Sequence, residues 1–117
     1  MECIDVFCHF LPRKYITAVQ KASDSSPKMF ERAQQIKAMV DLPARLEVLE
    51  EFPGYRQIIS LASPPTEGIA TQKAVELTQV ANDELAEVVR AGRGCICGFV
   101  AALPLNNIPA SVQEVRR

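Results

Sequence analysis

Short apolar runs alternate along this chain with longer stretches in which apolar residues recur every three or four positions. The runs occupy residues 3–10, 57–62 and 95–103, and a proline follows each of them within two residues. Apolar runs of this length, bounded by Pro or Gly, are typical of strands that are covered on both faces of a parallel sheet. We therefore predict three strands at these positions.

Helices are predicted between the strands. The clearest one covers about 67–91, where an apolar stripe follows one face and Gly92 and Gly94 supply a stop signal. The stripe consists of Ala70, Ala74, Leu77, Ala81, Leu85 and Val88. Shorter helices are predicted from Pro12 to about 21, from Ser26-Pro27 to about 40, from Asp41 to near Phe52, and from near Pro109 onward. This alternation favours βαβ units, whose parallel strands are joined by right-handed crossovers.

The predicted elements make one α/β domain that is incomplete. The 117 residues suffice for a single small domain. Three parallel strands leave two open sheet edges, and the last predicted helix has hardly begun at Arg117. We expect residues 1–117 to be a fragment or a truncated product.

Composition and charge exclude several classes of protein. The net charge is −1, with 13 basic and 14 acidic residues, and no basic cluster suggests nucleic acid or an anionic membrane surface. The apolar runs are too short to span a bilayer, and the N-terminus carries acidic residues where a signal peptide has basic ones. We expect a cytoplasmic protein. No phosphate-binding glycine loop or nucleophile elbow occurs.

The four cysteines form two close pairs, Cys3 with Cys8 and Cys95 with Cys97. Neither pair is C-x-x-C, and both lie in apolar segments, so we predict buried free thiols. The alternative is a small zinc site formed by these cysteines and His9, although structural zinc ligands usually follow C-x(2–4)-C spacing, from which Cys95 and Cys97 depart.

Residues 4–12, which read Ile-Asp-Val-Phe-Cys-His-Phe-Leu-Pro, resemble the opening strand of the amidohydrolase superfamily. That strand typically reads Asp-x-His-x-His, then a hydrophobic residue and Pro. Further segments resemble the branch that holds aminocarboxymuconate-semialdehyde decarboxylase and γ-resorcylate decarboxylase. They are residues 44–46, 55–61, 81–86, 98–105 and 112–115. The resemblance implies the N-terminal portion of a TIM-type (β/α)8 barrel, which needs roughly 200–250 residues when complete.

The resemblance also implies a metal site at the end of the first strand. His9 matches a metal ligand there, whereas Phe7 stands where the family has the first His and has no lone pair to donate. Asp5 has the same strand parity as His9, so we expect it to be a further metal ligand or a supporting carboxylate, with a buried carboxylate paired elsewhere as the alternative. Arg45 matches an arginine that approaches the substrate carboxylate, a task that suits a guanidinium group. The alternative for Arg45 is a solvated charge on a helix. No catalytic residue is assigned within this chain.

Two function classes remain open. In the first, the parent is a metal-dependent hydrolase or nonoxidative carboxy-lyase of small carboxylated substrates, with zinc as the expected divalent metal. This chain alone then lacks most of the site, and we expect it to be inactive and to bind no metal stably. In the second, it is a non-catalytic α/β module that covers its open edges by self-association into a homo-oligomer or with a completing subunit.

Overall fold

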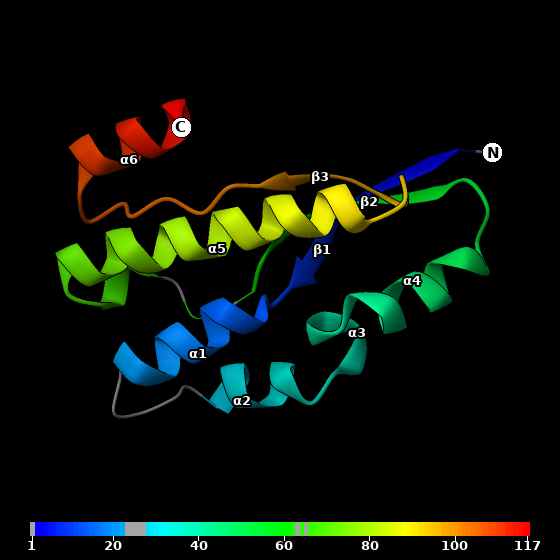
Figure 1. Ribbon diagram of the computed structural model, residues 1–117, viewed down its shortest axis with the longest axis horizontal. Coiled ribbons are helices and arrows are strands. Elements are labelled where there is room, and N and C mark those ends of the chain that lie inside the picture. Colours follow the sequence, from blue (N-terminus) through cyan, green and yellow to red (C-terminus); the bar gives the residue numbers. More distant parts are fainter. Residues whose placement is uncertain (1, 23–27, 63, 65) are drawn as a thin grey trace.

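The computed structural model describes residues 2–22, 28–62, 64 and 66–117. It contains three parallel strands, β1 (Cys3–Phe10), β2 (Tyr55–Leu61) and β3 (Ile96–Val100), in the sheet order β1-β2-β3. All three predicted strands are therefore confirmed, as is the α/β class. Figure 1 views the strands nearly edge-on, with most of the helices on one side of them.

Helices connect the strands in the predicted alternation, although several boundaries differ from those expected. The helices are α1 (Arg13–Ala22), α2 (Lys28–Gln34), α3 (Lys37–Val40), α4 (Leu42–Glu50), the 3-10 turn η1 (Thr66–Gly68), α5 (Thr71–Ala91) and α6 (Ile108–Arg116). The single helix expected from residue 26 to 40 is wrong, because Ile36 is extended and separates α2 from α3. Its expected cap, Ser26-Pro27, lies outside the described residues. The long helix begins at Thr71 rather than near 67.

Two helix starts follow the capping rule. The Asp41 side chain accepts a hydrogen bond from the Ala44 N–H at 3.0 Å and so caps α4, as predicted. Asn107 caps α6 in the same way through the Ala110 N–H at 3.1 Å. Each cap satisfies a backbone donor that the first helical turn leaves without a partner.

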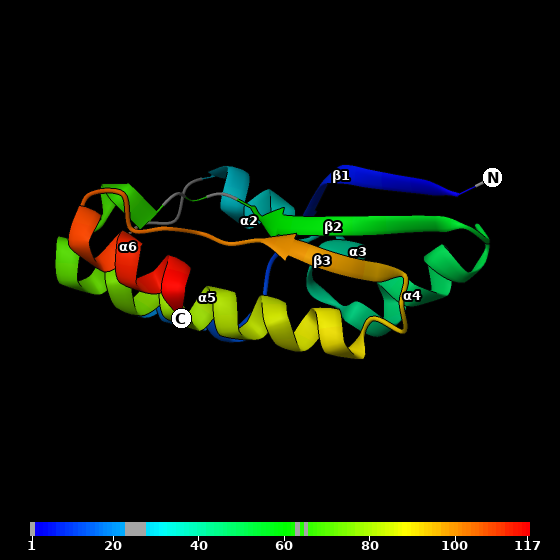
Figure 2. The same cartoon turned by 90° about the horizontal axis from the view of Figure 1, so that it is seen from above.

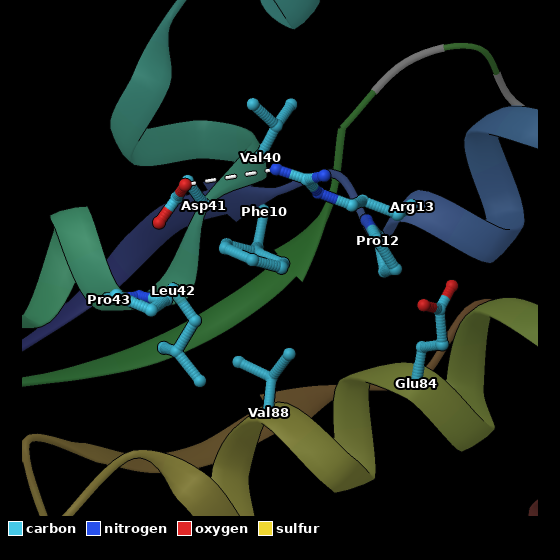
Figure 3. Close-up of a pocket in the computed structure, with 9 residues that line it drawn as sticks. All are labelled: Phe10, Pro12, Arg13, Val40, Asp41, Leu42, Pro43, Glu84 and Val88. Atoms are coloured by element: carbon cyan, nitrogen blue, oxygen red, sulfur yellow. Dashed lines mark ion pairs between the residues drawn. The ribbon is translucent and has the colours of Figure 1, made fainter.

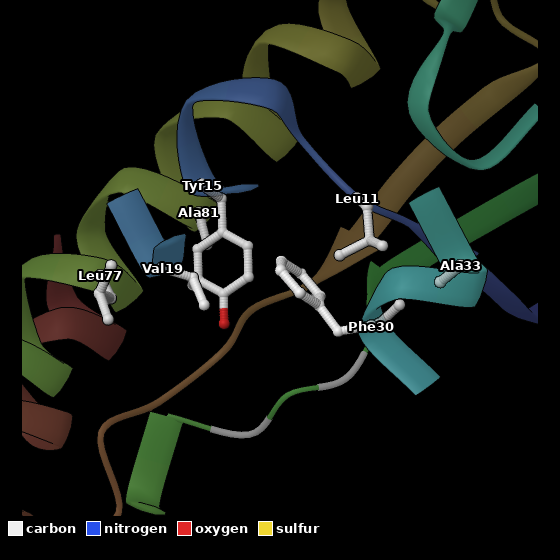
Figure 4. Packing of buried hydrophobic residues seen from close by; sticks show 8 residues of the cluster. Leu11, Tyr15, Val19, Phe30, Ala33, Leu77 and Ala81 are labelled. Carbon is white, nitrogen blue, oxygen red and sulfur yellow. The ribbon is translucent and has the colours of Figure 1, made fainter. Parts of the chain in front are cut away.

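The long helix α5 packs its predicted stripe inward. Its members Ala74, Leu77, Ala81 and Leu85 are buried and Val88 is half-buried, whereas Ala70 is exposed and precedes the helix. Two buried clusters result, one between α1, α2 and α5 and one between the sheet, α4 and α5. In the first, which Figure 4 shows, the rings of Tyr15 and Phe30 are fully buried.

The turn from α5 to β3 depends on two glycines for different reasons. Gly94 has φ +79°, in the region that favours glycine, and no atom lies within 4 Å of a Cβ placed there. A Cβ at Gly92 would lie 2.8 Å from Ile96 Cβ, so Gly92 is required by close packing of the turn against β3. The predicted stop at these residues is confirmed.

Strand β3 ends at Val100, three residues before the predicted end. The side chain of Asn82 on α5 accepts a hydrogen bond from the Ala102 N–H at 2.8 Å and donates one to the Ala102 carbonyl at 2.9 Å. The backbone after Val100 is therefore bonded to a helix side chain. This explains why an apolar run longer than the strand leaves the sheet early.

One face of the sheet is covered by no described helix. Figure 2 looks onto this face, with the strands side by side and α6 beyond the end of β3. Exposed apolar side chains on the strands include Phe7, Val6 and Val100. We call this surface the open face of the sheet.

Within the described residues, no helix is both long and apolar enough to cross a membrane.

Candidate functional site

Strand β1 carries an irregularity just before the predicted metal-binding residue. Asp5 pairs with Gln57, but Cys8 pairs with Ile59, so three steps along β1 match two steps along β2. One extra residue is therefore accommodated around Val6 and Phe7, which is the pattern of a β-bulge. A one-residue offset exchanges the two faces of a strand.

The bulge places Asp5 on the helix-covered face rather than on the open face. Its Oδ2 accepts a hydrogen bond from the Tyr55 hydroxyl at 2.5 Å, and its Oδ1 accepts one from the Phe7 N–H at 2.9 Å. The Tyr55 hydroxyl also accepts from Gln57 Nε2 at 3.5 Å, and Gln57 is buried against α4. The bond from Tyr55, and then that from Phe7, lowers the pKa of Asp5.

The expectation that Asp5 and His9 face the same way is therefore wrong. Residues four positions apart share a face only in a regular strand, and the bulge between Asp5 and Cys8 moves Asp5 to the opposite face from His9. Even in a regular strand, four residues span about 13 Å, which is too far for two side chains to bind one ion directly. Asp5 instead supports the bulge through its two hydrogen bonds.

His9 lies at the carboxyl end of β1, with its side chain toward the open face. Its Nδ1 lies 2.9 Å from the Oγ of Ser60, the residue with which it pairs on β2. Ser60 Oγ also donates to the Cys8 carbonyl at 3.3 Å. Sequence reasoning missed Ser60, because a serine in an apolar strand gives no signal until the register of β1 against β2 is known.

Phe7 lies beside His9, as two residues at i and i+2 of a strand should. The two rings meet edge to face with centroids 5.2 Å apart, and Phe7 is 82% exposed. A phenyl ring offers no lone pair, so His9 is the metal-ligand candidate at this strand end. Among the described residues, no group of three or more His, Cys, Asp or Glu side chains could hold a metal ion. This part of the chain fits a divalent metal through one ligand only.

Arg45 is buried on the helix-covered face, with 8% of its surface exposed. Its Nε donates to Gln57 Oε1 at 2.8 Å, and its Nη1 donates to the carbonyls of His9 at 2.9 Å and Ala38 at 3.0 Å. Burial lowers the pKa of Arg45, although a guanidinium stays charged at neutral pH. The side chain thus ties α4 to the ends of β1 and α3. Its predicted contact with a substrate carboxylate stays a prediction.

The cysteines are all free, but only Cys8 is buried. Burial raises the pKa of the Cys8 thiol to about 11, with a further contribution from Asp5. Cys3 and Cys97 are exposed and Cys95 is half-buried, so the prediction of buried thiols is wrong for these residues. The edges of a three-stranded sheet expose positions that a wider sheet would cover.

A cavity of about 330 Å³ lies on the helix side, where β1, α1, the start of α4 and α5 meet. Figure 3 shows its apolar lining and the ion pair between Arg13 and Asp41, at 3.8 Å. Glu84 lines it as well and accepts a hydrogen bond from the Tyr15 N–H at 2.9 Å, which supports the start of α1. The candidate residues His9, Asp5 and Arg45 do not line it.

The similarity of this chain to known proteins lies in its structure. No model of a protein family matches the chain, and neither does any curated protein. Solved structures match along its whole length, and they are members of the amidohydrolase superfamily with the TIM-barrel fold. The predicted resemblance and the predicted fold, the N-terminal part of such a barrel, are confirmed.

Several of the similar structures are decarboxylases. The 2,6-dihydroxybenzoate decarboxylase from Rhizobium is 26% identical with a TM-score of 0.74, and the match covers 100% of this chain and 34% of that one. A dihydroxybenzoic acid decarboxylase from Polaromonas sp. JS666, with bound manganese and the inhibitor 2-nitroresorcinol, is 25% identical with a TM-score of 0.72, covering 99% and 34%. A Staphylococcus aureus protein assigned to the amidohydrolases is 27% identical with a TM-score of 0.61, covering 100% and 33%. The chain spans about a third of the length of these structures.

Proposed function

We propose that this chain supplies the first three strands of a metal-dependent carboxy-lyase that acts on small aromatic carboxylates. The observation that carries the proposal is the position of His9. It lies at the carboxyl end of β1, on the open face, in a fold that matches two dihydroxybenzoate decarboxylases over nearly its whole length. In a TIM barrel, the carboxyl ends of the strands form the active-site face.

In this proposal, residues of this chain bind the metal and shape its surroundings. His9 provides one ligand to a divalent metal, and the other ligands come from strands outside this chain. When bound, such a metal would supply positive charge for the substrate and for the negative charge that develops on it. Phe7 adds an apolar wall beside His9 and excludes water from that side. Manganese is bound in one of the similar structures, and zinc, the metal expected from sequence, is the alternative to test beside it.

Arg45 is proposed to act on this site through the backbone. Its hydrogen bond to the His9 carbonyl, together with those to Gln57 and Ala38, fixes the end of β1 relative to α4. A direct contact with substrate would have to use Nη2, which makes none of these three bonds, on a side chain that is only 8% exposed. We therefore propose a positioning role for Arg45, with substrate binding as the competing hypothesis.

A chimera tests the proposed activity. This chain replaces the matching third of the Rhizobium decarboxylase, and decarboxylation of 2,6-dihydroxybenzoate is measured with Mn²⁺ and with Zn²⁺. We expect activity that falls at least about a hundredfold in the His9→Ala variant, together with weaker metal binding. A folded, metal-loaded chimera without activity would refute the substrate class. Unchanged metal content in His9→Ala would refute the role of His9.

A non-catalytic role remains the second candidate, because apolar surface is exposed beyond the open face. On α6, Ile108, Val112 and Val115 are 62%, 45% and 70% exposed and follow one side of the helix. Surfaces of this kind are common at protein interfaces. In this hypothesis the chain associates with itself or with a partner subunit. Sedimentation of the purified chain as a stable monomer over a hundredfold range of concentration would contradict self-association.

A further inference from the structure

The hydrogen bonds around His9 define which of its two ring nitrogens carries the proton. A serine hydroxyl has one hydrogen to donate and two lone pairs with which to accept. Ser60 Oγ lies within hydrogen-bond distance of two groups, His9 Nδ1 at 2.9 Å and the Cys8 carbonyl oxygen at 3.3 Å. The carbonyl can only accept, so a hydroxyl that serves both groups must donate to the carbonyl.

The alternative arrangement makes fewer bonds. If Nδ1 lacked a hydrogen, Ser60 would have to turn its own hydrogen toward the ring, and its bond to the Cys8 carbonyl would be lost. With the hydrogen on Nδ1, both bonds exist at once. The two neutral tautomers therefore differ by one hydrogen bond in a half-buried place, where such a bond is worth more than in water.

We infer that Ser60 is a positioning residue that holds neutral His9 in the Nδ1–H tautomer, leaving the Nε2 lone pair on the open face. This inference rests on the proposed function only in giving Nε2 a metal to bind. A histidine ligand needs a deprotonated nitrogen toward the metal, and the partner of the other nitrogen usually sets which one that is. Phe7 bounds the ring on another side through its edge contact at 5.2 Å.

The tautomer is measurable in the unaltered chain by nuclear magnetic resonance. His9 is the only histidine, so ¹⁵N–¹H correlations through the imidazole ring contain one set of signals. The spectra are recorded near pH 8.5, where a histidine of ordinary pKa is neutral. We expect Nδ1 to be the protonated nitrogen in a roughly five- to tenfold excess, as one additional hydrogen bond provides.

Three variants separate this role from a general effect on folding. Ser60→Ala should lose the preference, and Ser60→Thr, which keeps a hydroxyl, should retain it. The matched control is Ser111→Ala, which removes a buried serine far from His9 in the sequence, bonded to the Pro104 carbonyl at 2.9 Å, and should leave the tautomer unchanged. Backbone amide spectra confirm that each variant is folded.

Either of two results overturns the inference. One is a wild-type His9 that carries its proton mainly on Nε2. The other is a folded Ser60→Ala variant with the same tautomer as the wild type. If Ser60→Ala does not fold, the wild-type tautomer and the Ser60→Thr comparison still decide the question. Neither readout depends on metal or activity, so failure here is distinct from failure of the decarboxylase chimera.

Discussion

Replacing Arg45 by alanine should destabilise the fold far more than replacing any surface cation. The side chain is 8% exposed and donates three hydrogen bonds of 2.8 to 3.0 Å. A hydrogen bond to a charged group contributes about 1.5–3 kcal/mol, but the contributions within one network are not additive. Water can also reach some of the abandoned acceptors. We therefore expect Arg45→Ala to cost about 3–5 kcal/mol, near the cost of breaking other buried charged networks.

Urea unfolding followed by circular dichroism measures this loss. With an m-value of about 1.5 kcal/mol per molar, typical of a small protein, a loss of 3 kcal/mol lowers the midpoint by about 2 M. Arg45→Lys should lie between the wild type and Arg45→Ala, because an ammonium retains the charge but not the fork of donors. Alanine is favourable within a helix, so helix propensity contributes nothing to the loss.

The matched control is Lys14→Ala on α1. Lys14 pairs with Glu87 at 3.4 Å, and the two side chains are 67% and 55% exposed, so the pair should contribute at most about 1 kcal/mol. If Arg45→Ala cost no more than Lys14→Ala, the hydrogen bonds of Arg45 would not hold the end of β1. The positioning role would then be refuted, and substrate binding would become the better hypothesis.

Three further outcomes are expected. Because the pKa of Asp5 is lowered, its contribution to stability is present above about pH 3.8 and is lost as the pH falls through the folded pKa. Tyr55→Phe removes the main cause of the lowered Asp5 pKa. The melting temperature of this variant should therefore fall less between about pH 6 and pH 3 than that of the wild type, and an equal or greater fall would contradict this. A thiol reagent at about pH 8 should modify Cys8 last of the four cysteines, because its pKa is about 11, and early labelling of Cys8 located by mass spectrometry would show otherwise. Asn82→Ala should speed hydrogen exchange at the Ala102 amide by about tenfold or more, whereas unchanged exchange would mean that this bond does not hold the segment.

The order of strands and helices was predictable because it depends on local patterns. Apolar runs bounded by proline became strands, and the three- to four-residue repeat along α5 became its buried face. The cap at Asp41 and the stop at Gly92 were predictable for the same reason. Each signal lies within a few residues of the structure that it determines.

The site was harder to predict because its geometry depends on residues far apart in the sequence. The bulge that turns Asp5 away from His9 is held by Tyr55, fifty residues along the chain. The partner of the His9 ring, Ser60, is defined only by the register of β2. For Arg45 the sequence left a substrate contact or a solvated helix charge, and the second is wrong because the side chain is buried against residues of β1, β2 and α3. Local parity and family resemblance cannot distinguish such cases.

The parallel pairing of β1 with β2 also determines when the chain can fold during its synthesis. Cys3 pairs with Tyr55 and Phe10 with Leu61, so each residue of β1 meets a partner about fifty positions later. A ribosome that adds roughly 5–20 residues per second needs about 3–10 s to make that length. For those seconds β1 emerges with its apolar side chains and both hydrogen-bonding edges uncovered. Until β2 is made, this strand therefore presents an uncovered apolar segment to which a chaperone can bind.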